Sequence, residues 1–140
     1  MDGSVRFVDT SVLLRLLLRD DEAKAEQTVA LLLRMERGEI TLATSHLVIF
    51  ETIFTLQRRH GTDRSRIREI MRPIIDQRNL LVPDKPVLRR ALDLYVTHRI
   101  AFADAYNAAE MESRGIDQIY AWDTHYSRIP GITLLSPGQE

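Results

Sequence analysis

The feature that most constrains the fold of this chain is the alternation of short strand-like segments with longer helical segments. Strands are predicted at 5–8, 40–43, 80–82 and 118–121, with a candidate fifth strand at 132–134. Helices are predicted between them, at 11–18, 22–37, 45–59, 63–78, 84 to about 99, and 103–114. Strands that alternate with helices form parallel sheets whose two faces are covered by the helices. The sequence therefore predicts an α/β fold.

Local residues support the ends and faces of these helices. Ser45 is a suitable N-cap, and Gly61 and Gly115 follow the predicted ends of two helices. Two helices show apolar residues at helical spacing. These residues are Val29, Leu32 and Leu33 in the first, and Ile67, Ile70, Met71, Ile74 and Ile75 in the second.

Length and composition indicate one cytoplasmic domain. The chain has 140 residues, the size of an ordinary domain, so a single domain over 1–140 is expected. Its longest apolar runs are too short to cross a membrane, and its N-terminus lacks the pattern of a signal peptide. The absence of cysteine excludes disulfides, thiol catalysis and cysteine zinc sites.

The charged residues leave two interpretations open. A net charge of −1 argues against a protein that holds duplex nucleic acid mainly by releasing counterions. The basic residues are nevertheless almost all arginine, whose guanidinium group suits phosphate contact. The alternative is that they occupy solvated helix faces. Several are concentrated in one stretch: Arg58, Arg59, Arg64, Arg66, Arg68, Arg72 and Arg78.

Four acidic residues, far apart in the chain, each lie in apolar sequence. They are Asp9 in VRFVDTSVLL, Glu51 in HLVIFETIFTL, Asp104 in IAFADAYNAA and Asp123 in IYAWDTHYS. A carboxylate among core-forming residues is costly to desolvate unless a positive charge compensates it. No Lys or Arg lies three or four residues from Glu51 or Asp104, so a local helical ion pair is excluded there.

The predicted positions of these carboxylates point to one site. Asp9 and Asp123 follow predicted strands, where parallel sheets bind ligands, and would face each other if those strands are neighbours. Glu51 lies within an apolar helix and is expected to point inward or into a cleft. Asp104 lies in the first turn of a helix with small neighbours. Two carboxylates about 4 Å apart repel by roughly 4 kcal/mol at an effective dielectric of 20. Mg²⁺, or alternatively Mn²⁺, is the expected compensation.

Each of these residues also has a purely structural interpretation. Asp9 can cap a helix, Asp123 can form an Asx turn, and Asp104 can favour the positive end of its helix. His125 can be a surface residue or can touch substrate phosphate. Trp122 and Tyr126, which flank Asp123, can stack on an unpaired base but are more often packing residues.

The motifs in this order resemble those of the PIN-domain ribonucleases, and most closely the VapC-type toxins of toxin–antitoxin pairs. They are FVDTSVLL, an apolar helix with a central Glu, ADAYNAA and AWDTHYSRIPGI. The resemblance implies a single PIN-like domain with a sheet of about five parallel strands flanked by helices. It implies Mg²⁺- or Mn²⁺-dependent cleavage of RNA, a homodimer and a cognate antitoxin protein.

The resemblance also assigns roles to residues. It matches Asp9, Glu51, Asp104 and Asp123 to the four acidic catalytic and metal-binding positions of the family. Two positions depart from the family pattern. Ala121 replaces a common Ser or Thr, and so removes a supporting hydroxyl. His125 replaces a common acidic residue, which weakens the case for Asp123 as a direct ligand.

The sequence leaves two alternatives to a ribonuclease. A receiver-like regulatory domain would also bind Mg²⁺ at an acidic cluster, but it needs a Lys after a late strand, and none is present. A catalytically silent partner-binding module would keep the fold without needing the acidic set.

Overall fold

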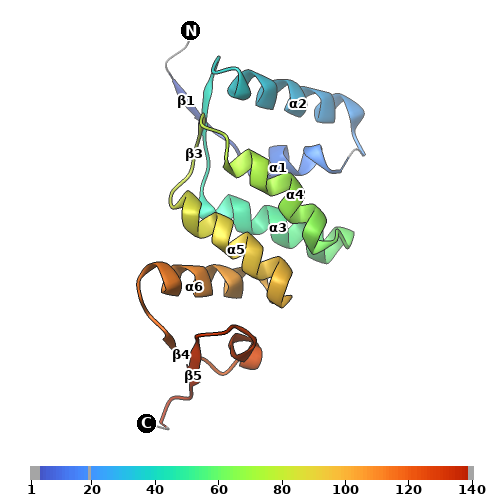
Figure 1. The fold of residues 1–140 in the computed structure, drawn as a ribbon. Coiled ribbons are helices and arrows are strands. Elements are labelled where there is room, and N and C mark those ends of the chain that lie inside the picture. Colours follow the sequence, from blue (N-terminus) through green and yellow to red (C-terminus); the bar gives the residue numbers. More distant parts are fainter. Residues whose placement is uncertain (1–3, 19, 139–140) are drawn as a thin grey trace. The chain divides into compact units, whose positions relative to one another are not determined.

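The computed structural model describes residues 4–18 and 20–138 and has the predicted α/β class (Figure 1). Helices and strands alternate along the chain in the predicted order. The chain divides into two compact units, Met1–Lys85 and Pro86–Glu140. The candidate site residues are therefore described unit by unit.

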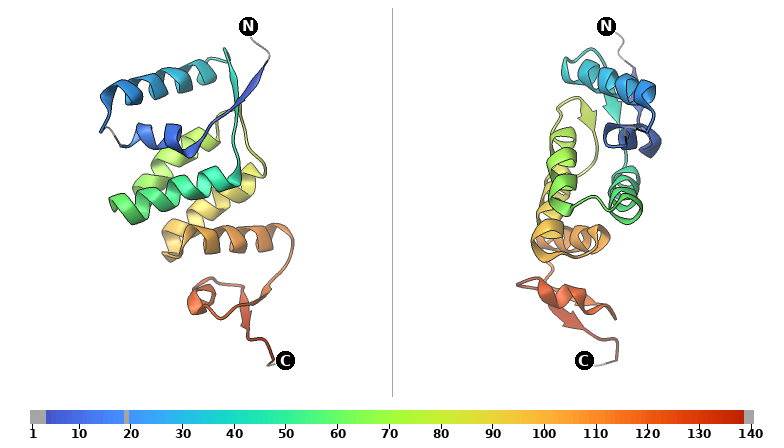
Figure 2. Two further views of the ribbon diagram at one scale, coloured as in Figure 1. Left: turned by 180° about the vertical axis from the view of Figure 1, so that it is seen from behind. Right: turned by 90° about the vertical axis from the view of Figure 1, so that its right-hand side faces the viewer.

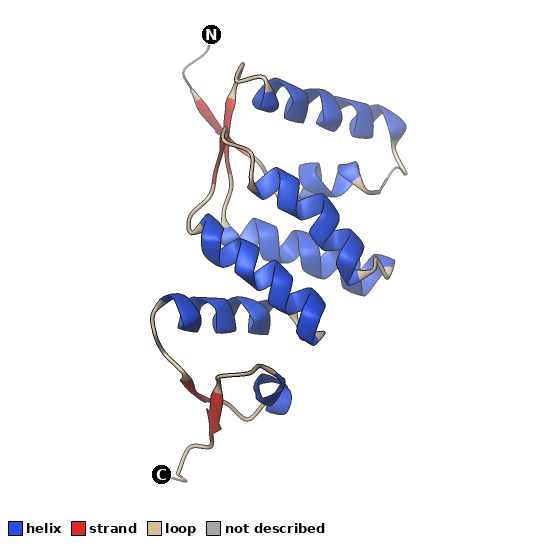
Figure 3. Cartoon of the chain, in the orientation of Figure 1, coloured by secondary structure: helices blue, strands red, loops and turns tan. Residues whose placement is uncertain are grey.

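The first unit contains a parallel sheet of three strands (Figure 3). Strand β2 (Thr41–Ala43) lies between β1 (Val5–Phe7) and β3 (Leu80–Leu81). The pairing continues beyond the strands, because the N–H of Val8 donates to the carbonyl of Ala43 over 2.8 Å. Asp9 therefore directly follows the hydrogen-bonded end of β1, as predicted.

Four α-helices precede β3 in the described part of the first unit. They are α1 (Thr10–Leu13), α2 (Glu22–Glu36), α3 (His46–His60) and α4 (Arg64–Ile75). The predicted helix 11–18 is shorter than expected, because α1 gives way to a 3-10 turn at Leu14–Leu16. Ser45 caps α3 as predicted, and Gly61 ends it in the left-handed conformation with φ of 59°.

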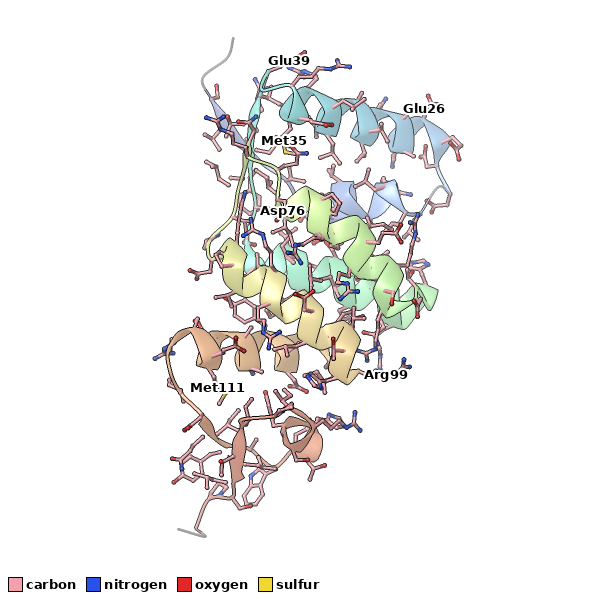
Figure 4. The ribbon with its side chains drawn as sticks, in the orientation of Figure 1. Glu26, Met35, Glu39, Asp76, Arg99 and Met111 are labelled. Carbon is pink, nitrogen blue, oxygen red and sulfur yellow. The ribbon has the colours of Figure 1, made fainter. Side chains whose placement is uncertain are left out.

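The core of the first unit forms where α3 and α4 lie side by side (Figure 2). Ile53 of α3 and Ile67 and Met71 of α4 are almost completely buried. In α2 the buried face differs from the predicted one, since Leu33 is exposed whereas Met35 is buried (Figure 4). The carbonyl of Met35 accepts a hydrogen bond from the Asn79 amide, which ties the end of α2 to the turn before β3.

The second unit combines two helices with a pair of parallel strands. Helix α5 (Lys85–His98) is followed by α6 (Phe102–Ser113), β4 (Gln118–Tyr120) and β5 (Thr133–Leu135). Tyr95 and Phe102 pack edge to face in its core, with ring centroids 5.8 Å apart. A 3-10 helix at Thr124–Arg128, which the sequence did not predict, connects the two strands.

All five predicted strands are present, but they pair in two groups. Strands β1, β2 and β3 form one parallel sheet, and β4 pairs in parallel with β5. A continuous sheet of about five strands therefore stays a prediction. Within 4–18 and 20–138, no helix is both long enough and apolar enough to span a membrane.

Candidate metal centre

Asp9 lies between β1 and α1 and is held by Ser11. Its carboxylate accepts hydrogen bonds from the Ser11 hydroxyl over 2.8 Å and from the Ser11 backbone N–H over 3.2 Å. These bonds, the hydroxyl first, hold the pKa of the Asp9 carboxyl below its ordinary value. Asp9 is thus the predicted N-cap of α1 and also an exposed, ionised oxygen donor.

Glu51 is connected to the same segment through Thr10. The buried Thr10 hydroxyl donates to Oε2 of Glu51 over 3.3 Å, so α1 and α3 bring the first two predicted acidic positions to one region of the first unit. Glu51 was expected to point inward or into a cleft. The first alternative is wrong, and the second stays a prediction. Glu51 is exposed, and so are its neighbours on the helix, Leu47 and Phe54, because α3 buries a different face.

Asp104 in the first turn of α6 is oriented by two residues outside the predicted acidic set. The Tyr126 hydroxyl donates to Oδ1 of Asp104 over 3.2 Å and accepts from the Asn107 amide over 3.0 Å. Tyr126 is only 4% exposed, and this burial raises the pKa of its phenol. The hydroxyl therefore stays protonated and remains a donor to Asp104.

Asp123 and His125 complete the cluster in the second unit. Oδ1 of Asp123 accepts the backbone N–H of His125 over 2.9 Å, the Asx-type geometry that the sequence allowed. The His125 ring places Nδ1 3.0 Å from Oδ1 of Asp123 and 3.8 Å from Oδ2 of Asp104. One ligand atom from each of these three residues lies within 4.8 Å of the other two.

The four predicted carboxylates thus occur as two pairs. Asp9 and Glu51 belong to the first unit, and Asp104 and Asp123 belong to the second. The convergence of all four on one ion stays a prediction. The donors in the second unit, two carboxylates and an imidazole nitrogen, are of the kinds that hold divalent cations in proteins, so they fit such an ion.

The structure decides between the two interpretations of the aromatic residues. The packing interpretation is confirmed for Tyr126, which is buried against Asp104 and Asn107. It is wrong for Trp122, whose side chain is 78% exposed. The buried Tyr126 and the exposed Trp122 differ although both flank Asp123, because the 3-10 helix turns only Tyr126 toward α6.

Two of the clustered arginines make ion pairs along α4. Nη1 of Arg66 lies 3.3 Å from Oε1 of Glu69 and both side chains are exposed, which fits the solvated-face interpretation for Arg66. Nε of Arg72 lies 3.4 Å from Oδ2 of Asp76 but is itself a buried atom, so that interpretation does not describe Arg72 fully. Arg58 differs, since its guanidinium lies 5.7 Å from the ring centre of the exposed Phe54. This pair is on the same helix as Glu51.

Sequence reasoning missed the roles of Tyr126 and His125. The spacing of Asp104 and Asn107, one helical turn apart, was visible, but the hydroxyl between them comes from a distant segment. The pairing of Asp123 with His125 is local, and the Asx geometry of WDTHYS was its only visible sign.

Comparisons with a family model, with curated proteins and with solved structures all give matches. The PIN domain family model matches residues 6–132. A VapC ribonuclease of Aquifex aeolicus (strain VF5) is 24% identical over 136 residues, which cover 97% of this chain and 99% of the relative. Among solved structures, that of Mycobacterium tuberculosis VapC20, a Sarcin-Ricin loop cleaving toxin, is 27% identical. It has a TM-score of 0.40 and covers 89% of this chain and 93% of that one.

Proposed function

The chain belongs to the PIN-domain family, and from that premise we propose that it is a divalent-metal-dependent endoribonuclease and the toxin of a type II toxin–antitoxin pair. One observation carries the metal-dependent part of the proposal. Asp104, Asp123 and His125 offer three ligand atoms within 4.8 Å of one another. The relative from Aquifex aeolicus is named a ribonuclease, which supports RNA as the substrate class.

The proposed site consists of Asp9, Glu51, Asp104 and Asp123, which hold Mg²⁺ or Mn²⁺ directly or through water. A bound divalent cation lowers the pKa of a water ligand and stabilises negative charge on a phosphoryl oxygen. The observation that supports Asp9 as a donor is its exposed carboxylate, which the two hydrogen bonds from Ser11 hold in one orientation. The same bonds lower the pKa of Asp9, so the carboxylate stays ionised to a lower pH than an ordinary aspartate does. The hydrogen bonds at Glu51 and Asp104 support fixed donor positions.

Neighbouring residues act by orienting these carboxylates. The Ser11 hydroxyl donates a hydrogen bond to Oδ2 of Asp9, and the Thr10 hydroxyl donates one to Oε2 of Glu51. Tyr126 donates to Oδ1 of Asp104, which leaves Oδ2 on the side of His125. Such supporting hydrogen bonds fix the direction of the ligands, and their loss typically costs about 10–100-fold in metal affinity or activity.

For the four carboxylates to act together, the two groups of strands have to form one sheet. We propose that all five strands belong to one sheet, which gives about five parallel strands within a single PIN-like domain. All described pairings are parallel, which supports a common sheet.

The proposed substrate is single-stranded or loop RNA, because a compact site must reach an exposed phosphodiester. The proposed partners are a cognate antitoxin protein that covers the site and a second copy of the chain in a homodimer. The proposed location is the cytoplasm, where the RNA substrate is present. The name VapC ribonuclease of the Aquifex aeolicus protein supports the toxin assignment.

The decisive experiment is cleavage of single-stranded RNA by the purified protein with Mg²⁺ or Mn²⁺, with and without EDTA. We expect cleavage that EDTA abolishes and that Asp9→Asn abolishes while circular dichroism and Tm stay unchanged. The matched control is Asp84→Asn, since Asp84 is an exposed aspartate with φ of 53°, a conformation that Asn also tolerates.

Four results would contradict the proposal in different ways. Undiminished cleavage by Asp9→Asn would remove Asp9 from the site. Cleavage that resists EDTA would remove the metal. A folded, metal-binding protein that cleaves no RNA would favour a silent partner-binding module, and a stable aspartyl phosphate formed with a small phosphodonor would favour a receiver-like domain.

A further inference from the structure

We propose that His125 is itself a ligand of the catalytic cation, and that its imidazole nitrogen makes the site prefer Mn²⁺ to Mg²⁺. This inference rests on the metal dependence in the proposed function, but it does not rest on RNA being the substrate. It concerns a position at which the chain departs from the acidic residue expected of its family. No other His is part of the cluster, as far as the described residues are concerned.

The geometry of the three side chains suits one small ion. Nδ1 of His125 is 3.0 Å from Oδ1 of Asp123 and 3.8 Å from Oδ2 of Asp104. Two donors that bind one ion at about 2.1 Å lie roughly 3 Å apart when adjacent and about 4.2 Å apart when opposite. Both distances at Nδ1 fall in that interval, so Nδ1 of His125 can share one ion with either of the two carboxylates.

The local fold explains why Nδ1 faces the two carboxylates. Asp123 accepts the backbone N–H of His125 at the start of the 3-10 helix, and this turn brings the two side chains to one side. The buried hydroxyl of Tyr126 donates a hydrogen bond to Oδ1 of Asp104. The other carboxylate oxygen, Oδ2, is the one that lies near Nδ1 of His125. One turn of chain thus supplies Asp123, His125 and the residue that orients Asp104.

The alternative role for His125 is that of a proton donor to Asp123. In that arrangement Nδ1 carries a hydrogen and has no lone pair for an ion, so the same atom cannot serve both roles at once. The two roles therefore differ in a property that can be measured directly: whether a histidine nitrogen is bonded to the ion.

The chemistry of the donor predicts which ion is preferred. Mg²⁺ favours oxygen ligands and near-ideal octahedral geometry, whereas imidazole suits the softer transition ions such as Fe²⁺, Ni²⁺ and Zn²⁺. Mn²⁺ accepts carboxylate and water oxygens as Mg²⁺ does, but it also tolerates nitrogen. A carboxylate in place of His125 would add one negative charge and an oxygen donor, which favours Mg²⁺.

The experiment compares the full-length protein with His125→Ala and His125→Asp, with His60→Ala as a matched control. His60 is an exposed histidine at the end of α3 and is not part of the cluster. Mn²⁺ and Mg²⁺ affinities are measured by isothermal titration calorimetry. Pulsed electron paramagnetic resonance of bound Mn²⁺ then detects the ¹⁴N nucleus of a directly coordinated imidazole.

We expect a directly coordinated ¹⁴N signal in the wild type and in His60→Ala, and no such signal in the two His125 variants. Mn²⁺ affinity should fall at least about tenfold in His125→Ala, with a smaller change for Mg²⁺. His125→Asp should recover Mg²⁺ binding better than Mn²⁺ binding. Absence of a Mn²⁺ site in the wild type, or of the ¹⁴N signal there, or persistence of that signal in His125→Ala, would overturn the inference.

An RNA cleavage assay on the same samples separates this inference from the proposed function. A ¹⁴N signal without any RNA cleavage would sink the ribonuclease proposal and leave His125 as a ligand. Metal-dependent cleavage without a ¹⁴N signal would remove His125 as a ligand and leave the ribonuclease proposal standing.

Discussion

The hydroxyl of Tyr126 donates a hydrogen bond to Oδ1 of Asp104 over 3.2 Å, although 22 positions separate the two residues in the chain. The phenol is buried, and its pKa is raised mainly by that burial, so the proton that makes this bond stays in place. An aromatic residue that sequence alone marks as packing thus also sets the direction of a candidate metal ligand.

Tyr126→Phe should keep the packing and lose the hydrogen bond. We expect metal affinity or RNA cleavage to fall about 10–100-fold, because Asp104 loses its orienting donor. The free energy of unfolding should fall by only about 0.5–1.5 kcal/mol, the net value of a typical hydrogen bond. Titration calorimetry with Mn²⁺ and urea denaturation measure the two quantities separately.

Tyr120→Phe is the matched control, since Tyr120 is 51% exposed and lies on β4 outside the cluster. It should leave Mn²⁺ affinity unchanged. Equal Mn²⁺ affinities in wild type and Tyr126→Phe would show that the hydroxyl does not position Asp104.

Ser11→Ala should raise the pKa of Asp9 toward its ordinary value. The Ser11 hydroxyl is the largest cause of the depressed pKa, and the mutation removes it while the Ser11 backbone N–H remains. The pKa is read from the pH dependence of the Asp9 carboxyl resonance by NMR. Ser65→Ala, at an exposed serine of α4, is the control that should not shift it.

Ser11→Ala should also change how the free energy of unfolding depends on pH. A carboxyl whose pKa is depressed in the folded protein stabilises that state above the pKa of the unfolded chain. This contribution is lost as pH falls through the lower, folded-state pKa. Wild type should therefore exceed Ser11→Ala in stability at neutral pH, and the difference should shrink in acid. A difference that grows on acidification would contradict the assignment of the Asp9 pKa.

Much of the fold follows from patterns within single elements. The apolar spacing along α4 predicts its buried face, and all five predicted residues except the half-buried Ile70 are buried: Ile67, Met71, Ile74 and Ile75. Ser45 and Gly61 mark the two ends of α3 because each satisfies backbone groups that the helix leaves free. Such features depend on neighbours within a few residues, so the sequence contains them.

The parts of the fold and of the site that the sequence did not predict depend on contacts between distant segments. The exposure of Leu47 and Glu51 could not be derived from α3, whose sequence is apolar on several faces, because tertiary packing selects which face is buried. The link from Asn107 through Tyr126 to Asp104 likewise joins a helix to a later turn. By contrast, the N-cap hydrogen bond from the Ser11 backbone N–H to the Asp9 carboxylate spans only two residues and was within reach of sequence reasoning.

Neighbouring residues of α3 offer a matched test of the core. Ile53 is fully buried, whereas Phe54 is 61% exposed. Ile53→Ala should lower the free energy of unfolding by about 2–5 kcal/mol, because it leaves a cavity in the core. Phe54→Ala should lower it by no more than about 1 kcal/mol, because an exposed side chain leaves no cavity and its contact with the Arg58 guanidinium contributes about 0.5–1 kcal/mol. Urea denaturation of both variants checks the prediction, and a larger loss in Phe54→Ala would show that this face of α3 is covered.

Trp122 provides the most direct test of how RNA would meet the site. It is the only tryptophan in the chain, it is 78% exposed, and it directly precedes Asp123. An exposed indole beside a proposed metal ligand is placed to stack on an unpaired base, and such stacking contributes about 1–3 kcal/mol.

We therefore expect single-stranded RNA to quench the fluorescence of Trp122, measured in the Asp9→Asn background so that the RNA stays intact. Trp122→Ala in that background should weaken RNA binding roughly 5- to 150-fold, the equivalent of that stacking energy. Trp122→Phe should retain part of the affinity, since it keeps an aromatic face. Mn²⁺ affinity should be equal in all three proteins, because the indole offers no ligand atom. Unquenched fluorescence at saturating RNA, together with an unchanged affinity in Trp122→Ala, would mean that the bases bind elsewhere.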